Sequence, residues 1–301
     1  MTDVAPLPEP SPPSLARRIV AFPLTLMLIA VVVFAAASLL ANLLIDRIPR
    51  HSGSPMILLN ALAVLACMLP AYWLFCRFVA REPMVLFART GAAKELAAGV
   101  AAGLAAFSAV VAIVALLGGY HVAGWGHAVT TLWAALAMAI ISGFAEELLF
   151  RGILFRYIEQ TAGSWAALAA TSALFGAAHL ANPNASLVAA AAIAAEAGIL
   201  LGAVYMLTRR LWAAMGLHAA WNFTQGWVFG LPVSGGGGGD GLVRGQLSGP
   251  EILTGGAFGL EASLAGVIVA TSAGVAVLVV AARRGEVKPP MWKRRGETVL
   301  I

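Results

Sequence analysis

Long apolar runs separated by short polar connections dominate the chain. Eight runs rich in Ala, Leu and Val lie near residues 19–45, 55–78, 96–118, 128–150, 164–181, 185–207, 211–230 and 260–282. A helix needs about 20 apolar residues to cross the hydrocarbon core of a bilayer. The runs lack the alternation that a membrane β-barrel requires. We therefore predict an all-α, polytopic membrane bundle of about eight transmembrane helices.

The composition agrees with a membrane protein. The 301 residues are 60% hydrophobic and only 11% charged, with a mean hydropathy of +0.88, whereas soluble domains are about 25% charged. The net charge is +5, which in a soluble protein suggests nucleic acid. Here the basic residues flank apolar runs, so we expect the lipid bilayer as a partner and no nucleic acid.

Basic residues are concentrated in alternate connections and in the tail. They are Arg77, Arg81, Arg89 and Lys94, then Arg151 and Arg156, then Arg209 and Arg210, and finally Arg283, Arg284, Lys288, Lys293, Arg294 and Arg295. The connections between these are poor in Lys and Arg, except the first, which carries Arg47 and Arg50. The positive-inside rule then places both termini in the cytoplasm. We expect a multi-pass integral protein of the plasma (inner) membrane.

Three regions follow from this pattern. Residues 1–16 are rich in Pro and Ser and are expected to form a disordered tail. Residues 17–285 form the membrane-embedded domain, and residues 286–301 form a basic cytoplasmic tail. The glycine run at 234–240 is expected to be a flexible loop, and its role is left open.

Three polar motifs interrupt three apolar runs. They are Glu146-Glu147-Leu-Leu-Phe-Arg151, Phe175-Gly-Ala-Ala-His179 and His218-Ala-Ala-Trp-Asn222. Ionisable groups inside a bilayer are costly and indicate a functional site. We predict that the three motifs share one intramembrane polar site.

Helical spacing separates the roles of the two glutamates. Glu147 and Arg151 stand at positions i and i+4, so they lie on one helix face in the order that favours an ion pair. Glu146 is rotated from this face by about 100° and has no such partner. Glu147 is thus predicted to have a structural role, and Glu146 is predicted to take part in the chemistry of the site. The alternative is that both are ordinary charges at a helix end.

The second motif is predicted to lie at the height of the first. Gly163 stands almost midway along the sequence between Glu146 and His179. If 161–163 is the turn of an antiparallel hairpin, both side chains reach the same depth. Phe175 shares a helix face with His179 and is expected to shield its ring from water.

The third motif offers hydrogen-bond donors. His218 and Asn222 share a helix face, and an imidazole with an amide can stabilise an oxyanion. The alternative is an interhelical hydrogen bond that holds the bundle. Glu196, in the middle of the sixth run, could pair with a site histidine, line a water path or bond a neighbouring helix, and its role stays open.

The three motifs resemble the CAAX protease and bacteriocin-processing (CPBP, also called Abi) family of intramembrane glutamic or metalloproteases, which includes the type II CAAX prenyl endopeptidases. The resemblance covers about residues 128–225, the expected catalytic core. It implies that Glu146 and His179 activate water, while His218 and Asn222 stabilise the oxyanion. Many family members are called metalloproteases, so zinc held by Glu146, His179 and His218 stands beside a metal-free mechanism.

The resulting prediction is an endopeptidase whose site opens toward the cytoplasmic surface of the membrane. Its substrate is a peptide or protein, including the case of a lipid-modified tail. Two other functions remain open. The polar cluster could stabilise a non-catalytic immunity or partner-binding protein, or Glu146, His179 and Glu196 could form the proton relay of a transporter. The substrate's identity and the oligomeric state stay open.

Overall fold

The computed structural model describes residues 14–45 and 55–294. The expected disordered tail falls almost entirely outside this part of the chain, although its last two residues, Leu15 and Ala16, begin helix α1. Arg47 and Arg50 also lie outside the described residues.

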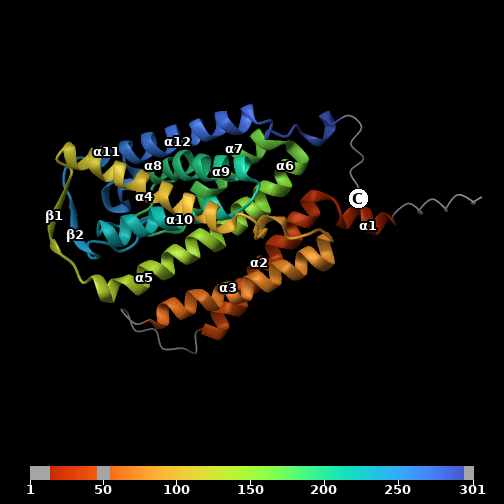
Figure 1. Ribbon diagram of the computed structural model, residues 1–301, viewed down its shortest axis with the longest axis horizontal. Helices are drawn as coiled ribbons and strands as arrows, with labels where there is room; N and C mark the ends of the chain where they lie inside the picture. The colour runs from red at the N-terminus through yellow and green to blue at the C-terminus, as the bar shows by residue number, and fades with distance from the viewer. Residues whose placement is uncertain (1–13, 46–54, 295–301) are drawn as a thin grey trace, which may run out of the picture.

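Long helices run back and forth along the longest axis of the molecule (Figure 1), which confirms the all-α bundle. Their bounds are α2 Pro23–Ile45, α3 Met56–Leu74, α4 Ala92–Leu116, α5 Ala128–Ile141, α6 Arg156–Ala162, α7 Ser164–Ala178, α8 Leu187–Ile193, α9 Ile199–Thr208, α10 Trp212–Phe223 and α12 Leu264–Arg283. Two shorter helices are α1 Leu15–Val20 and α11 Glu251–Thr254.

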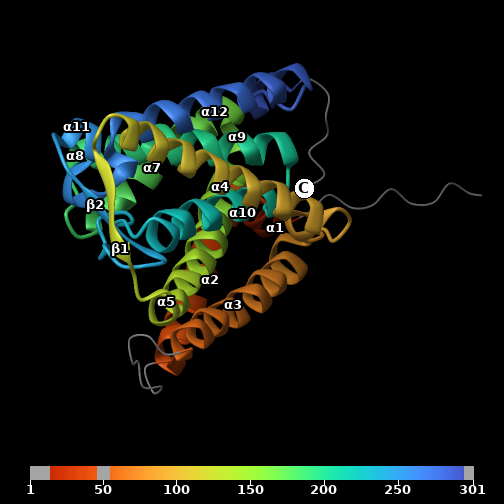
Figure 2. The same ribbon diagram turned by 60° about the vertical axis from the view of Figure 1, so that its left-hand side comes forward.

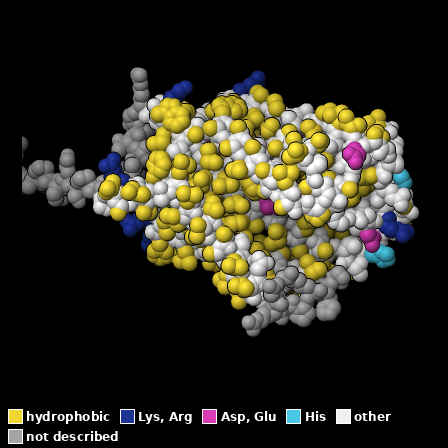
Figure 3. Space-filling model, turned by 180° about the vertical axis from the view of Figure 1, so that it is seen from behind, with side chains coloured by type: hydrophobic (Ala, Val, Ile, Leu, Met, Phe, Trp, Pro, Cys, Tyr) yellow, Lys and Arg dark blue, Asp and Glu magenta, His cyan; other side chains and the backbone are white. Residues whose placement is uncertain are grey.

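Wide π-helical turns join or extend several of these helices. They span Ser142–Glu146 and Leu148–Phe155 between α5 and α6, and Ala194–Gly198 between α8 and α9; others follow α3 at Phe75–Ala80 and α10 at Thr224–Val228. With these joints, seven helices of the described residues are long and apolar enough to cross a membrane. The predicted span missing from these seven is the seventh run, 211–230, where α10 has only 12 residues before its π turn. Figure 3 shows the largely hydrophobic flank that the bundle presents.

The fourth span continues beyond its apolar run. The run ends near residue 150, but the helix continues to Ala162, as the expected hairpin about residues 161–163 requires. Its polar residues find partners inside the bundle, because Arg156 pairs with Glu82 and Glu159 pairs with Arg209. The added turns support the expected hairpin, in which α7 begins directly after Gly163.

Helices α4 and α10 approach each other unusually closely. A methyl group on Gly99 or Gly103 of α4 would overlap the carbonyl oxygen of Ala213 or Leu217 in α10, and one on Gly216 of α10 would overlap a carbonyl oxygen of α4. Glycine permits this backbone contact because it has no side chain. The contact sets the position of α10, which carries the third polar motif.

A small antiparallel sheet closes one end of the bundle. Strand β1, Tyr120–Trp125, pairs with strand β2, Val243–Leu247. The sequence pattern did not predict these strands, because each is short and lies between glycines in a connection. The sheet ties the connection before α5 to the long connection after α10, as Figures 1 and 2 show.

Candidate functional site

The two glutamates of the first motif face different surroundings. Glu146 ends the π-helical segment Ser142–Glu146, and Glu147 stands between this segment and the next one. The side chain of Glu147 is fully buried, whereas that of Glu146 is 35% exposed. Such π turns are rare and occur frequently at functional sites. The buried acid therefore needs internal partners, while its neighbour is open to a reactant.

Arg151 is the first partner of Glu147. Its Nη1 lies 2.8 Å from Oε1 of Glu147, and both side chains are buried. Its Nη2 donates to the carbonyl oxygens of Ala197 and Gly198, at 3.0 and 3.4 Å, in the π turn between α8 and α9. The guanidinium also lies 4.7 Å from the ring centre of Phe175. Carboxylate, carbonyls and aromatic face together compensate a buried charge that would otherwise be strongly destabilising.

His218 connects the two glutamates. Its Nδ1 lies 2.9 Å from Oε1 of Glu147, and its Nε2 lies 3.9 Å from Oε2 of Glu146. An ionised carboxylate only accepts hydrogen bonds, so Nδ1 carries a proton that it donates to Glu147. The ring is thereby oriented with Nε2 toward Glu146. Because the bond joins residues 71 positions apart, helical spacing did not reveal it.

His179 is oriented by the backbone of its own helix. Its Nδ1 lies 2.8 Å from the carbonyl oxygen of Phe175. A carbonyl oxygen only accepts, so Nδ1 carries the proton, and Nε2 of the neutral ring keeps its lone pair. The Phe175 ring lies 4.7 Å from the ring of His179 and 5.9 Å from that of His218. Phe175 therefore separates the two imidazoles and covers the buried Arg151.

The predicted residues meet around two spaces that share His179 and Asn222 as lining residues. Glu146, His179 and Asn222 line one cleft with about 690 Å³ of empty volume. His179, His218 and Asn222 also line a second, small cavity of about 20 Å³, which has room for about one water molecule. The side chains that come from three separate spans thus converge on one place. Their catalytic roles remain a proposal.

The cleft lies at the end of the bundle that carries the β-sheet. Its rim includes Asn182 and Pro183, which follow α7, together with Val233, Ser234 and Gly236 from the connection after α10. The basic residues near both ends of the described chain lie at the opposite end, where α1 and the segment after α12 are found (Figure 1). The cleft and the basic residues near both ends of the described chain thus lie at opposite ends of the bundle.

The second cavity contains two carboxylates outside the motifs. Glu196 and Glu261 both line it and are almost fully buried. Oε2 of Glu261 accepts the backbone N–H of Ser234 at 2.6 Å, and Oε1 accepts its hydroxyl at 3.2 Å. Burial raises the pKa of Glu261 to about 7 even though these bonds to Ser234 lower it. The sequence did not reveal Glu261, because an acid just before a helix is usually solvated.

The glycine run is more than a flexible spacer. Gly235 has a φ of 79° and donates its N–H to the carbonyl oxygen of Phe258. Asp240 lies 2.7 Å from Nδ1 of His127, and its pKa is lowered chiefly by the hydrogen bond from the His127 backbone. With Ser234 held by Glu261, the run is attached at several points and forms part of the cleft wall.

The zinc set considered from the sequence is not assembled. Within residues 14–45 and 55–294, no three His, Cys, Asp or Glu side chains form a group suited to a metal ion. The Nδ1 hydrogen bonds of His179 and His218 leave Nε2 of each ring free, which is the arrangement that zinc-binding histidines use. As placed, however, Glu146, His179 and His218 do not form a group suited to a common zinc ion.

Comparison with known proteins assigns this region to a family. Residues 128–224 match the family model described as type II CAAX prenyl endopeptidase Rce1-like. The matched segment contains all three motifs and nearly the whole region of the expected resemblance, which is thereby confirmed. Searches of curated proteins and of solved structures found no match to the chain.

Proposed function

From the match of residues 128–224 to the Rce1-like family of type II CAAX prenyl endopeptidases, we propose that the chain hydrolyses peptide bonds within the membrane. The seven membrane-crossing helices of the described residues make it a multi-pass integral membrane protein. The proposal rests above all on one observation: Glu146, His179 and Asn222, from three different spans, line a single cleft.

Glu146 and His179 are proposed to activate the attacking water. Glu146 is the partly exposed acid of the cleft, and Nε2 of His179 is left with a lone pair. A water between these two groups gives a proton to one of them as its oxygen attacks the scissile carbonyl carbon. The carbonyl π bond opens, and a tetrahedral intermediate with one oxyanion is formed.

Asn222 and His218 are proposed to stabilise that oxyanion. The Asn222 amide can donate two hydrogen bonds. A doubly protonated His218 would donate Nδ1–H to Glu147 and direct Nε2–H toward the cleft. Donors that are already oriented in a site shielded from water stabilise developing charge strongly. When the intermediate collapses, the C–N bond breaks and the leaving nitrogen takes the proton held by Glu146 or His179.

Glu147 and Arg151 act in this proposal as positioning residues. Neither is exposed, so neither reaches a substrate. Arg151 donates a hydrogen bond to Glu147, and Glu147 holds His218 in one orientation. The substrate class that follows is a polypeptide with its scissile bond close to the membrane surface, and a lipid-modified tail belongs to this class. The plasma (inner) membrane is the proposed location.

The test compares purified wild type with Glu146→Gln and His179→Gln in lipid nanodiscs, using a library of membrane-anchored peptides. Both variants should lose at least about 100-fold in rate, since general acid–base catalysis contributes 10²–10⁴, while their thermal unfolding stays unchanged. Glu251→Gln is the matched control, because Glu251 is an exposed acid at the same end of the bundle. Full activity in Glu146→Gln would reject the mechanism and favour a purely structural role for the polar cluster.

A further inference from the structure

We infer that the cleft opens on the non-cytoplasmic side of the membrane, so that its substrates are polypeptide segments presented outside the cytoplasm. The inference rests on the proposed peptidase function and narrows its substrate class. It is carried by the position of the cleft relative to the charged residues at the two ends of the bundle.

The rim of the cleft comes from one end of the bundle, while Met138, Ile141 and Ser142 of the fourth span line its inner wall. Its rim is built by the connection between α7 and α8 and by the segment after α10. Asn182 donates a hydrogen bond to the carbonyl oxygen of Ser234, and Asn184 donates one to that of Gly235, each at 3.0 Å. These bonds hold the two connections together beside Glu146 and His179. Any polypeptide in the cleft therefore contacts this end.

Basic residues mark the other end. Among the described residues, every Lys and Arg other than Arg151 and Arg244 lies there: Arg17, Arg18, Arg77, Arg81, Arg89, Lys94, Arg156, Arg209, Arg210, Arg283, Arg284, Lys288, Lys293 and Arg294. Short connections rich in Lys and Arg stay in the cytoplasm during insertion. The asymmetry places the basic end in the cytoplasm and the cleft end on the opposite side.

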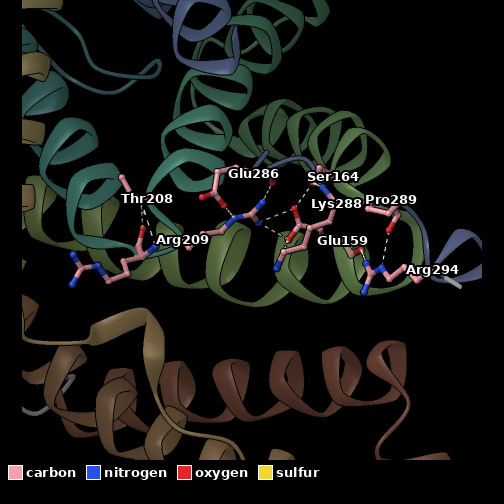
Figure 4. A network of polar contacts seen from close by, with 9 residues as sticks. Glu159, Ser164, Thr208, Arg209, Glu286, Lys288, Pro289 and Arg294 are labelled. Carbon is pink, nitrogen blue, oxygen red and sulfur yellow. Dashed lines mark hydrogen bonds and ion pairs between the residues drawn. The ribbon is translucent and has the colours of Figure 1, made fainter. Parts of the chain in front are cut away.

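Ion pairs also join several helix ends at the basic end of the bundle. Glu159 in α6 lies 2.7 Å from Nη1 of Arg209, which follows α9, and 3.6 Å from Nζ of Lys288, which follows α12. Arg209 also pairs with Glu286 at 3.0 Å. Figure 4 shows how these side chains, together with Ser164 at the start of α7, meet between the helix ends. This network ties the ends of α6 and α7 to the ends of α9 and α12.

The depth of the site adds a distance argument. Glu146 is separated from the basic end by the helical stretch that ends at Ala162, and His179 by the whole of α7, which begins at Ser164. At 1.5 Å per residue, Glu146 lies about 15 Å from Arg156, and His218, whose ring faces Glu146, lies about 12 Å from Arg210. The reactive groups therefore lie part-way along the bundle, and the rim of the cleft indicates the side from which they are reached.

The orientation can be measured by thiol labelling of the full-length protein in intact bacterial cells. Gly237→Cys places a thiol in an exposed part of the glycine run, where a side chain meets no neighbouring atom. Arg284→Cys places one at the exposed basic end. The wild type controls for the two native cysteines, Cys67 and Cys76, which lie within the second span.

A membrane-impermeant maleimide should label Gly237→Cys in intact cells at least tenfold more than Arg284→Cys, and permeabilised cells should label both. Labelling of Arg284→Cys in intact cells, or equal labelling of the two positions, would overturn the inference. A cleavable segment that is exported across the membrane should be cut, and the same segment kept in the cytoplasm should not.

The labelling result does not depend on whether the protein is active. Labelling that shows the inverted orientation would therefore overturn the inference and leave the proposed chemistry intact. An inactive protein with the expected labelling would instead reject the proposed chemistry and leave the orientation intact.

Discussion

Nδ1 of His218 lies 2.9 Å from Oε1 of Glu147, the same oxygen that accepts a hydrogen bond from Arg151. One buried carboxylate oxygen thus joins two spans and orients the imidazole that faces Glu146. The apparently duplicated acids of the first motif have separate tasks. One is enclosed and holds a histidine, and the other is partly exposed in the cleft.

Removal of Arg151 should destabilise the protein strongly. Arg151→Met leaves Glu147 buried without its cation, and breaking a buried pair costs about 3–5 kcal/mol. Arg151→Lys should recover only part of this loss, because an ammonium cannot donate to Glu147 and to two carbonyls with the geometry of a guanidinium. Unfolding free energies measured in mixed micelles would show the ranking. Arg89→Met, at an exposed position, is the control, and an equal small loss in both variants would contradict the account.

Asn222→Ala should affect the chemical step more than binding. Loss of one oxyanion donor typically lowers kcat by about 10²–10³, and KM should change little because the contact strengthens only in the transition state. Steady-state kinetics on a cleaved peptide would separate the two constants. Asn42→Ala removes an exposed amide of α2 that does not line the cleft, and it should leave both constants unchanged. A rise in KM at constant kcat would instead assign Asn222 to substrate binding.

A methyl group between α4 and α10 should disturb the site from a distance. Gly103→Ala would overlap the backbone of Leu217, directly before His218, so α10 must shift. Overpacking of this kind costs about 1–3 kcal/mol, and activity should fall with stability. Gly237→Ala introduces the same methyl group where it meets no neighbouring atom. Wild-type melting temperature and activity in Gly103→Ala would show that the contact does not set the position of α10.

Glu261 should make stability depend on pH. Its pKa is raised from 4.5 to about 7 by burial, so the folded protein binds this proton more tightly than the unfolded chain does. The stabilising contribution is fully present below about pH 4.5 and is lost as the pH rises through about 7, by about 3 kcal/mol in total. Glu261→Gln does not titrate and should lack this loss.

Melting temperatures of wild type and Glu261→Gln at pH 5 and pH 8 provide the comparison. Wild type should be less stable relative to the variant at pH 8 than at pH 5. Glu196 faces the same cavity but is present in both proteins, so the difference reports on Glu261. A constant difference across the two pH values would contradict the raised pKa.

The sequence pattern predicted the parts of the structure that depend on helical spacing. The long membrane-crossing helices, the Glu147–Arg151 contact and the separate direction of Glu146 all follow from hydrophobic runs and residue intervals. The bond between His218 and Glu147, the carbonyl partners of Arg151 and the attachment of Ser234 to Glu261 were not predicted. Each joins distant segments, and the π turns that align them leave no periodic signal.

The side of the membrane on which the cleft opens also depends on how distant segments meet. The basic residues by themselves indicate only which helix ends lie on the same side of the membrane. The hairpin about residues 161–163 was predicted, and Arg156 and Glu159 in its first arm are neutralised by partners from other segments. The rim of the cleft was not predicted, because it is formed by connections that carry no helical periodicity.

Isotope labelling of the products tests the central claim most directly. Wild type and Glu146→Gln are incubated with a cleaved membrane peptide in ¹⁸O-water, and the fragments are weighed by mass spectrometry. The account predicts one ¹⁸O atom in the new carboxyl terminus with wild type, and at least about a 100-fold lower rate with Glu146→Gln. Cleavage by Glu146→Gln at the wild-type rate, or a wild-type product without label, would contradict water activation by Glu146.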